Sequence, residues 1–279
     1  IVDIRQSLGQ SFGNFKFDYI SEGEGNGHLG GSSVRCMLED SYHNVWLGLY
    51  GAGIDFVSRE QPLFKLVTYG QVDPVYHLST KSVMGLAVDH QGLLWAGTDG
   101  DGLNMFDRNM ARVAAPIELP GRSVQTIHCD RKGNMWIGAF SDNAYIKSPG
   151  GSMRKVFNEM QDVRCFFEDG MRMWIGTSEG LYVVDVNTQN VIKHYNLKNN
   201  FVRSVAKDQQ GRMWIGTFGG GLLIYDSRMN FIKQLTKPKG FPSNTVNAVI
   251  ADRHGRIWCA TGEGLVSFPK GDVHKFTTY

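Results

Sequence analysis

The sequence predicts an all-β fold, a β-propeller of four-stranded blades, from three observations. All six tryptophans of the 279-residue chain fall into one register, at intervals of 49, 41, 38, 40 and 44 residues. Each Trp lies in the same local pattern: a Val-led alternating run, an Asp, a turn, an apolar residue, the Trp and a Gly-rich loop. No helical period occurs along the chain. Repeats of about 40 residues with four short strands are typical of propeller blades.

The fifth repeat displays each predicted strand most clearly. Residues 202–207 alternate and are rich in β-branched residues, which predicts the first strand. Asp208 caps its own backbone and Gly211 accepts a positive φ, so a tight turn follows. Trp214 belongs to a second, antiparallel strand, and we expect it to pack between adjacent blades. The third and fourth strands are predicted over 222–225 and 231–235.

The remaining repeats keep this order with small departures. The first repeat carries Asn44 in place of the turn Gly, and the fourth is one residue shorter between Asp169 and Trp174. Six tandem repeats cover residues 33–279, whereas residues 1–20 resemble only the third and fourth strands of a blade. We therefore expect residues 1–279 to form a single propeller domain, with six complete blades plus half of a seventh. The missing strands of this seven-bladed propeller would come from chain beyond Tyr279, which makes the sequence a fragment of a longer protein.

The composition excludes several classes of function. Lys plus Arg total 29 against 27 Asp plus Glu, and no basic stretch dominates, so nucleic acid is not an expected partner. No apolar run reaches the 18 residues of a membrane-spanning helix, so we expect no membrane contact by this segment. The four cysteines lack CxxC spacing and clustered His partners, which argues against zinc. We expect buried, unpaired thiols at Cys36, Cys129, Cys165 and Cys259.

No sequence pattern in the chain indicates catalysis. There is no G-x-S-x-G elbow, and no Ser-His-Asp set can be assembled from the sequence order. The glycines at 219–221 are not followed by Lys-Ser/Thr, so they are a repeat loop and not a phosphate-binding loop. The scattered histidines are interpreted as polar turn residues. We therefore predict no catalytic residue, no cofactor and no metal.

The candidate site lies on one face of the predicted ring, where first strands begin and second strands end. The residue after each first-strand Val is Arg in three repeats, and the residue ending three second strands is aromatic. Aromatic rings stack on sugars, and Arg pairs with carboxylates and hydroxyls. The alternative interpretation is that each Arg only bonds a neighbouring blade. The predicted ligand-binding residues are Arg35, Tyr50, Asp99, Gln125, Phe140, Arg164, Arg203, Phe218 and Asn247.

The repeats resemble the two-component regulator propeller repeat. The run Asp-x-x-Gly-x-apolar-Trp-Ile-Gly-Thr-x-x-Gly-Gly-Leu is matched closely by the second and fifth repeats, and less closely by the others. The resemblance implies the periplasmic sensor region of a Bacteroides-like hybrid two-component system. It also implies neighbouring propeller and Ig-like domains, a homodimer, and a histidine kinase outside this chain. An oligosaccharide is the ligand class that it implies.

Three functions stay open at this point. The chain is predicted to be a sensor module that binds an oligosaccharide, rather than an enzyme. A protein-interaction scaffold is the first alternative, and a carbohydrate-active propeller enzyme is the second. A glycosidase would need two carboxylates about 5–10 Å apart, for which the candidates are Asp99, Asp101, Glu179 and Glu263.

Overall fold

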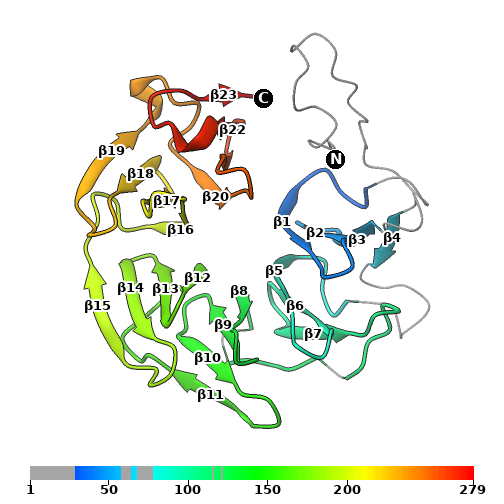
Figure 1. Ribbon diagram of the computed structural model, residues 1–279. Coiled ribbons are helices and arrows are strands. Elements are labelled where there is room, and N and C mark those ends of the chain that lie inside the picture. Colours follow the sequence, from blue (N-terminus) through cyan, green and yellow to red (C-terminus); the bar gives the residue numbers. More distant parts are fainter. Residues whose placement is uncertain (1–28, 58–63, 68–77, 115, 121) are drawn as a thin grey trace.

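The computed structural model describes residues 29–57, 64–67, 78–114, 116–120 and 122–279. These residues form six antiparallel sheets arranged as blades around a central opening (Figure 1), so the all-β propeller prediction is confirmed. No helix in these ranges is long and apolar enough to cross a membrane. The strands, with two 3-10 turns, are β1 (Val34–Glu39), β2 (Val45–Leu49), β3 (Gly53–Val57), β4 (Phe64–Val67), β5 (Val83–Val88), β6 (Leu94–Thr98), β7 (Leu103–Phe106), β8 (Val124–Cys129), β9 (Met135–Ala139), β10 (Ala144–Lys147), β11 (Met153–Val156), β12 (Cys165–Asp169), β13 (Arg172–Thr177), β14 (Gly180–Asp185), β15 (Val191–Tyr195), β16 (Val202–Lys207), β17 (Met213–Thr217), β18 (Leu222–Tyr225), β19 (Phe231–Leu235), η3 (Lys237–Lys239), β20 (Val246–Ala251), β21 (Ile257–Thr261), β22 (Gly264–Phe268), η4 (Pro269–Gly271) and β23 (Thr277–Thr278).

The second blade departs from the prediction, because it has three strands where four were expected. Beyond β7 the chain returns along the sheet only through isolated bridges, Phe106 with Arg112 and Leu103 with Ile117. Pro116 lies between these bridges and has no N–H to donate, which interrupts a continuous fourth strand. The half blade predicted at residues 1–20 lies outside the described residues, and six blades are what the structure describes.

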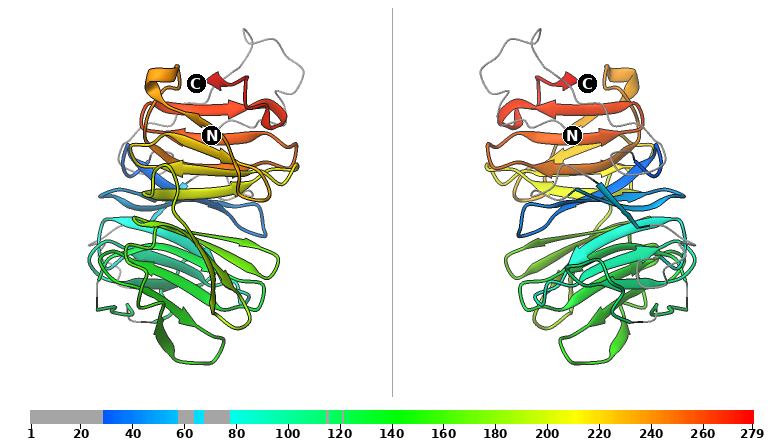
Figure 2. Two further views of the ribbon diagram at one scale, coloured as in Figure 1. Left: turned by 90° about the vertical axis from the view of Figure 1, so that its left-hand side faces the viewer. Right: turned by 90° about the vertical axis from the view of Figure 1, so that its right-hand side faces the viewer.

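The strands of each blade run between two faces of the ring (Figure 2). The first strand of each blade lies innermost and lines the central opening (Figure 1). In the fifth blade Val202 pairs with Thr217, and Lys207 with Met213. The start of the first strand and the end of the second therefore share one face, as predicted. We call this the bulge face, for the β-bulges described below, and the opposite face the Asp-turn face.

Adjacent blades are joined by a valine that packs against a glycine. The first-strand valine is fully buried in the second to sixth blades. Each packs on the second-strand glycine of the preceding blade, where an added Cβ would lie 2.4–3.1 Å from the valine side chain. Only glycine permits so close an approach of side chain to backbone. The pairs are Gly48 with Val83, Gly97 with Val124, Gly138 with Val163, Gly176 with Val202 and Gly216 with Val246.

A hydrogen bond between the turn Asp and the repeat Trp stabilises five of the six blades. The indole Nε1 donates to an Asp carboxylate oxygen six residues earlier, at 2.7–3.0 Å. In the fifth blade the bond joins Trp214 and Asp208 at 2.7 Å, and Trp214 is fully buried. The repeat pattern predicted the burial of the Trp but not this bond.

The shortened turn of the fourth blade removes the same bond. Asp169 pairs directly with Arg172 across a two-residue turn, and its carboxylate accepts a hydrogen bond from Lys207 at 2.7 Å instead. The Nε1 of Trp174 is buried without a hydrogen-bond partner. The fourth blade therefore buries an unpaired donor that the other blades satisfy.

The cysteines are unpaired thiols, as predicted, but only Cys259 is fully buried, and Cys36, Cys129 and Cys165 are partly buried. Burial raises the pKa of Cys36 and of Cys165 to about 12. These thiols are therefore protonated at neutral pH and behave as small apolar side chains.

We expect Trp214→Phe to cost about 1–3 kcal/mol more unfolding free energy than Trp174→Phe, because only the first change removes a hydrogen bond to a charged group. Both changes shorten a buried aromatic side chain, so Trp174→Phe is the matched control. Urea unfolding with constant m-values measures the difference. Equal losses for the two variants would show that the Asp–Trp bond contributes nothing.

Candidate functional site

The predicted first-strand site residues occupy β-bulges. The strand register is interrupted in five blades immediately after the first-strand valine. A bulge leaves one residue out of the ladder and redirects its side chain. In the fourth blade Arg164 stands just before β12, and its N–H donates to the carbonyl of Gly176 at 2.8 Å. The residues in this slot, in blade order, are Arg35, Met84, Gln125, Arg164, Arg203 and Asn247.

A backbone hydrogen bond holds the aromatic slot beside the bulge. The N–H of the residue immediately after the second strand donates to the carbonyl of the residue before the first-strand valine. Tyr50 bonds Ser33, Phe140 bonds Ser123 and Phe218 bonds Phe201, each at 2.9 Å. The two slots are therefore adjacent in every blade that forms this bond.

Each of the three arginines stacks on an aromatic ring of the bulge face. The guanidinium carbon of Arg35 lies 4.6 Å from the ring centre of Tyr50. That of Arg203 lies 4.8 Å from Phe218. Arg164 reaches across to the preceding blade and lies 5.1 Å from Phe140. The structure thus brings together the arginines and aromatics that the sequence placed on one face, in cation–π geometry.

The sequence interpretation missed Phe201. Its ring centre lies 5.2 Å from the guanidinium carbon of Arg164 and 5.3 Å from the ring of Phe218. A signal was present, since the slot before the first-strand valine is small and polar in all other repeats and aromatic only here. The equivalent residues are Ser33, Ser82, Ser123, Asp162 and Thr245.

Two amides complete a continuous chain of contacts across blades three to six. Arg164 Nη1 donates to Gln125 Oε1 at 2.8 Å, and Arg203 Nη1 donates to Asn247 Oδ1 at 2.5 Å. Both bonds cross to a neighbouring blade. Arg164 and Arg203 therefore do bond neighbouring blades, as the alternative interpretation of the sequence expected. We call the set the guanidinium–aromatic belt; its members are Gln125, Phe140, Arg164, Phe201, Arg203, Phe218 and Asn247.

Three predicted residues lie outside the belt. Arg35 and Tyr50 form their own stacked pair on the first blade. Asp99 follows the second strand of the second blade, where its N–H donates to the carbonyl of Ser82 and its own carbonyl accepts a weak bond from Thr80. No described contact joins Asp99 to an arginine or an aromatic ring.

The bulge face is electropositive around the arginines. Burial lowers the pKa of Arg203, and the charges of Arg164 and Arg35 lower it further. Burial also lowers the pKa of Arg164, while the carboxylate of Asp162 opposes that shift. Among the described residues, no Asp or Glu forms an ion pair with any of the three arginines.

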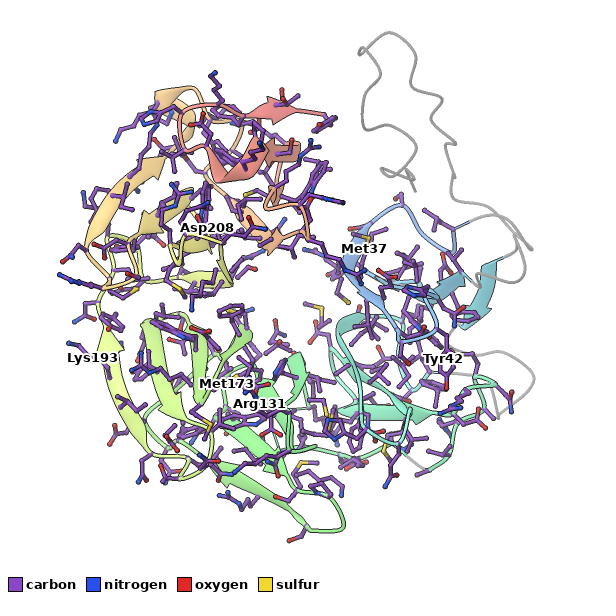
Figure 3. The ribbon with its side chains drawn as sticks, viewed as in Figure 1. Met37, Tyr42, Arg131, Met173, Lys193 and Asp208 are labelled. Carbon is purple, nitrogen blue, oxygen red and sulfur yellow. The ribbon has the colours of Figure 1, made fainter. Side chains whose placement is uncertain are left out.

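The opposite face holds a cavity of about 480 Å³ between the first and second blades. Its walls include Tyr42, Trp46 and Arg108, and Tyr42 is labelled in Figure 3. Asp40 and Asp89, which also line it, already accept hydrogen bonds from Trp46 and Trp95. None of the nine predicted site residues lines this cavity.

Two of the residues considered for a glycosidase, Glu179 and Glu263, make local contacts. Glu263 is ion-paired with Lys237 at 2.6 Å. The backbone N–H of Glu179 donates to Thr177, and its carbonyl lies 3.2 Å from the His194 ring nitrogen. Within the described ranges, no group of three or more His, Cys, Asp or Glu is placed to hold a metal ion.

Comparisons with solved structures support the fold and the sensor context. The extracellular domain of the hybrid two-component system BT3049 from B. thetaiotaomicron is 38% identical, with a TM-score of 0.72. The match covers 94% of this chain and 36% of that one. A streptogramin B lyase has the same TM-score at 13% identity, over 90% of this chain and 84% of the lyase, and shares the fold alone.

A curated relative points to the same class of protein. A histidine kinase P4 from Formosa agariphila is 25% identical over 221 residues, which are 75% of this chain and 14% of the kinase. This chain therefore spans only a small part of that relative and about a third of the B. thetaiotaomicron domain.

The family model described as two-component regulator propeller matches residues 28–51, 118–141, 196–219 and 240–263. The matched segments fall on the first two strands of the first, third, fifth and sixth blades. Four of the six described blades therefore match the two-component regulator propeller repeat.

Proposed function

We propose that this propeller is the ligand-binding module of the periplasmic sensor region of a hybrid two-component system, and that it binds an oligosaccharide at the guanidinium–aromatic belt. The belt is the observation that carries the proposal. Phe140 and Phe218 are 43% and 49% exposed although each is stacked on an arginine. Exposed aromatic rings beside charged hydrogen-bond donors are the surface that sugars require.

The scaffold is well suited to holding such a site rigidly. Each belt residue either adjoins the valine of an interblade contact or makes the backbone bond that follows the second strand. Functional side chains on a rigid framework lose little conformational entropy on binding. The belt side chains already contact one another, so the site is pre-organised.

The belt supports binding better than catalysis or scaffolding. It contains no carboxylate pair and no nucleophile-base pair, which hydrolysis and acyl transfer require. A protein-docking surface of standard size would need about 800 Å² per partner with an apolar centre. The belt instead consists of two guanidiniums, three aromatic rings and two amides.

A signal would leave this module through its neighbours. We propose that ligand binding biases the arrangement of adjacent propeller and Ig-like domains in a homodimer, and thereby controls a histidine kinase elsewhere in the protein. The similarity to an extracellular two-component domain supports this assignment. Binding can shift such an equilibrium only by its difference in affinity between the two arrangements.

We also infer that a seventh blade closes the ring. The first and last blades lie on either side of its open part (Figure 1). Val34 is 41% exposed although its five equivalents are fully buried, and Met37 beside it is 70% exposed (Figure 3). On the last blade, Ile250 is 58% exposed and Ala260, at the position of the packing glycine, is exposed. A seventh repeat would cover both apolar surfaces, and its first-strand valine would face Ala260 where the other junctions have a glycine.

Substitutions in the belt test the proposed site. Isothermal titration against an oligosaccharide panel identifies a ligand, with product analysis to detect turnover. We expect Arg203→Ala or Phe218→Ala to weaken binding of that ligand by about 1–3 kcal/mol, or roughly 5- to 150-fold. Phe231→Ala on the outer strand β19 is the matched control and should leave affinity unchanged. Unchanged affinity in both belt variants would place the site elsewhere, and release of cleaved product would indicate an enzyme.

Substitution of Val34 tests the seventh blade. Val34→Asp should cost less than about 0.5 kcal/mol in this chain, because the side chain is exposed. In the longer ectodomain the same change should cost about 2 kcal/mol or more, because it would bury an unpaired carboxylate. Val124→Asp, at the equivalent buried position, should be strongly destabilising in both proteins. A small effect of Val34→Asp in both would contradict the seventh blade.

A further inference from the structure

We infer that the ligand of the guanidinium–aromatic belt is anionic, a sugar that carries carboxylate or sulfate groups; this inference rests on the proposed function and specifies its ligand class. The starting observation is an excess of positive charge. Arg164 and Arg203 stand on adjacent blades, four and five, and Arg35 adds a third guanidinium on the same face. The three charges act on one another, since those of Arg164 and Arg35 both lower the pKa of Arg203.

The partners of the belt arginines leave that charge uncompensated. Arg164 and Arg203 each donate one side-chain hydrogen bond among the described residues, and both acceptors are neutral amides, Gln125 and Asn247. An amide satisfies an N–H group but does not neutralise a guanidinium, as a carboxylate would. The Nε of Arg164 is buried without any partner.

Two cations elsewhere on the blades are paired with carboxylates across a blade junction. Between the fourth and fifth blades, Lys207 is paired with Asp169 at 2.7 Å. Between the third and fourth blades, Arg131 is paired with Glu168 at 2.8 Å. Both of these pairs join neighbouring blades, as the belt arginines do, but through carboxylates. In these two ties a carboxylate neutralises the cation, whereas the belt arginines bond only neutral amides.

The nearest carboxylate does not cancel the excess. Asp162 raises the pKa of Arg164, which shows that it lies within electrostatic range. Its Oδ1 accepts the backbone N–H of Ser141 at 2.6 Å, and no ion pair joins it to Arg164. Among the described residues, the guanidiniums of Arg35, Arg164 and Arg203 are therefore left without an ion pair.

The rings determine how an anionic sugar would lie. Phe201 is in contact with both Arg164 and Phe218, so a ring surface connects the two arginines across blades four and five. A pyranose ring stacked on the exposed Phe218 or Phe140 would hold its acidic substituents within reach of these guanidiniums. Free N–H groups on the guanidinium forks would then bond the carboxylate or sulfate oxygens.

Sucrose octasulfate and sucrose form a matched pair of probes with the same carbohydrate core, the first anionic and the second neutral. We expect calorimetry at low salt to detect binding of sucrose octasulfate and none of sucrose. Binding should weaken as sodium chloride is raised, because salt screens exposed charges. Arg164→Gln and Arg203→Gln should each weaken it at least tenfold. Lys193→Gln removes a charge at the perimeter on β15 (Figure 3) and should leave it unchanged.

Each other outcome overturns the inference. Absence of octasulfate binding, equal binding of sucrose, or equal effects of Lys193→Gln and Arg203→Gln would show that the belt does not select anions. A neutral oligosaccharide whose affinity falls on Phe218→Ala but not on Arg203→Gln would refute the anionic class and leave the proposed function standing. If every belt variant kept its binding of both sucrose octasulfate and the oligosaccharide, the inference and the proposed function would both be refuted.

Discussion

The close approach of a first-strand valine to a glycine of the preceding blade is the contact on which the rest of the structure depends. It recurs at all five junctions between the described blades, and it leaves no room for a Cβ on the glycine. Since the bulge follows this valine directly, the contact also determines where the bulged side chain emerges. The belt is thus a consequence of blade packing rather than an addition to it.

The bulged position has two roles that the same side chains satisfy. Arg164 and Arg203 tie neighbouring blades through Gln125 and Asn247, and the same guanidiniums stack on exposed rings. A guanidinium that bonds a neighbouring blade can also bind a ligand, because it has five N–H donors and each bond to an amide uses only one of them. Structural and binding roles are therefore not alternatives at these residues.

The sequence predicted the features that the repeat encodes locally. The Trp register, the Asp turns and the alternation of residues 202–207 were enough for the blade, the burial of Trp214 and the two faces of the ring. The sharing of a face by Arg203 and Phe218 followed from strand direction alone. Strand pairing and face assignment depend on periodicity, which a single sequence displays.

Features that depend on the three-dimensional path of the chain were not predictable in the same way. The Asp–Trp bond needs the three-dimensional path of the turn, and its loss at Trp174 follows from one missing residue. The missing fourth strand of the second blade depends on where Pro116 falls along a sheet edge. Phe201 was overlooked because its slot lies before the strand, where the other repeats carry small polar residues. The Gln125 and Asn247 bonds require the spacing of neighbouring blades.

The central claim is that the ligand binds the bulge face and not the Asp-turn face. Hydrogen–deuterium exchange of this propeller with and without sucrose octasulfate tests it in one experiment, because both faces are read from the same blades. The account predicts slower exchange in residues 162–166, 199–204 and 216–220, and unchanged exchange in the Asp turns at 208–212 and 252–256. Protection confined to the Asp turns, or to the cavity walls near Tyr42, would contradict it.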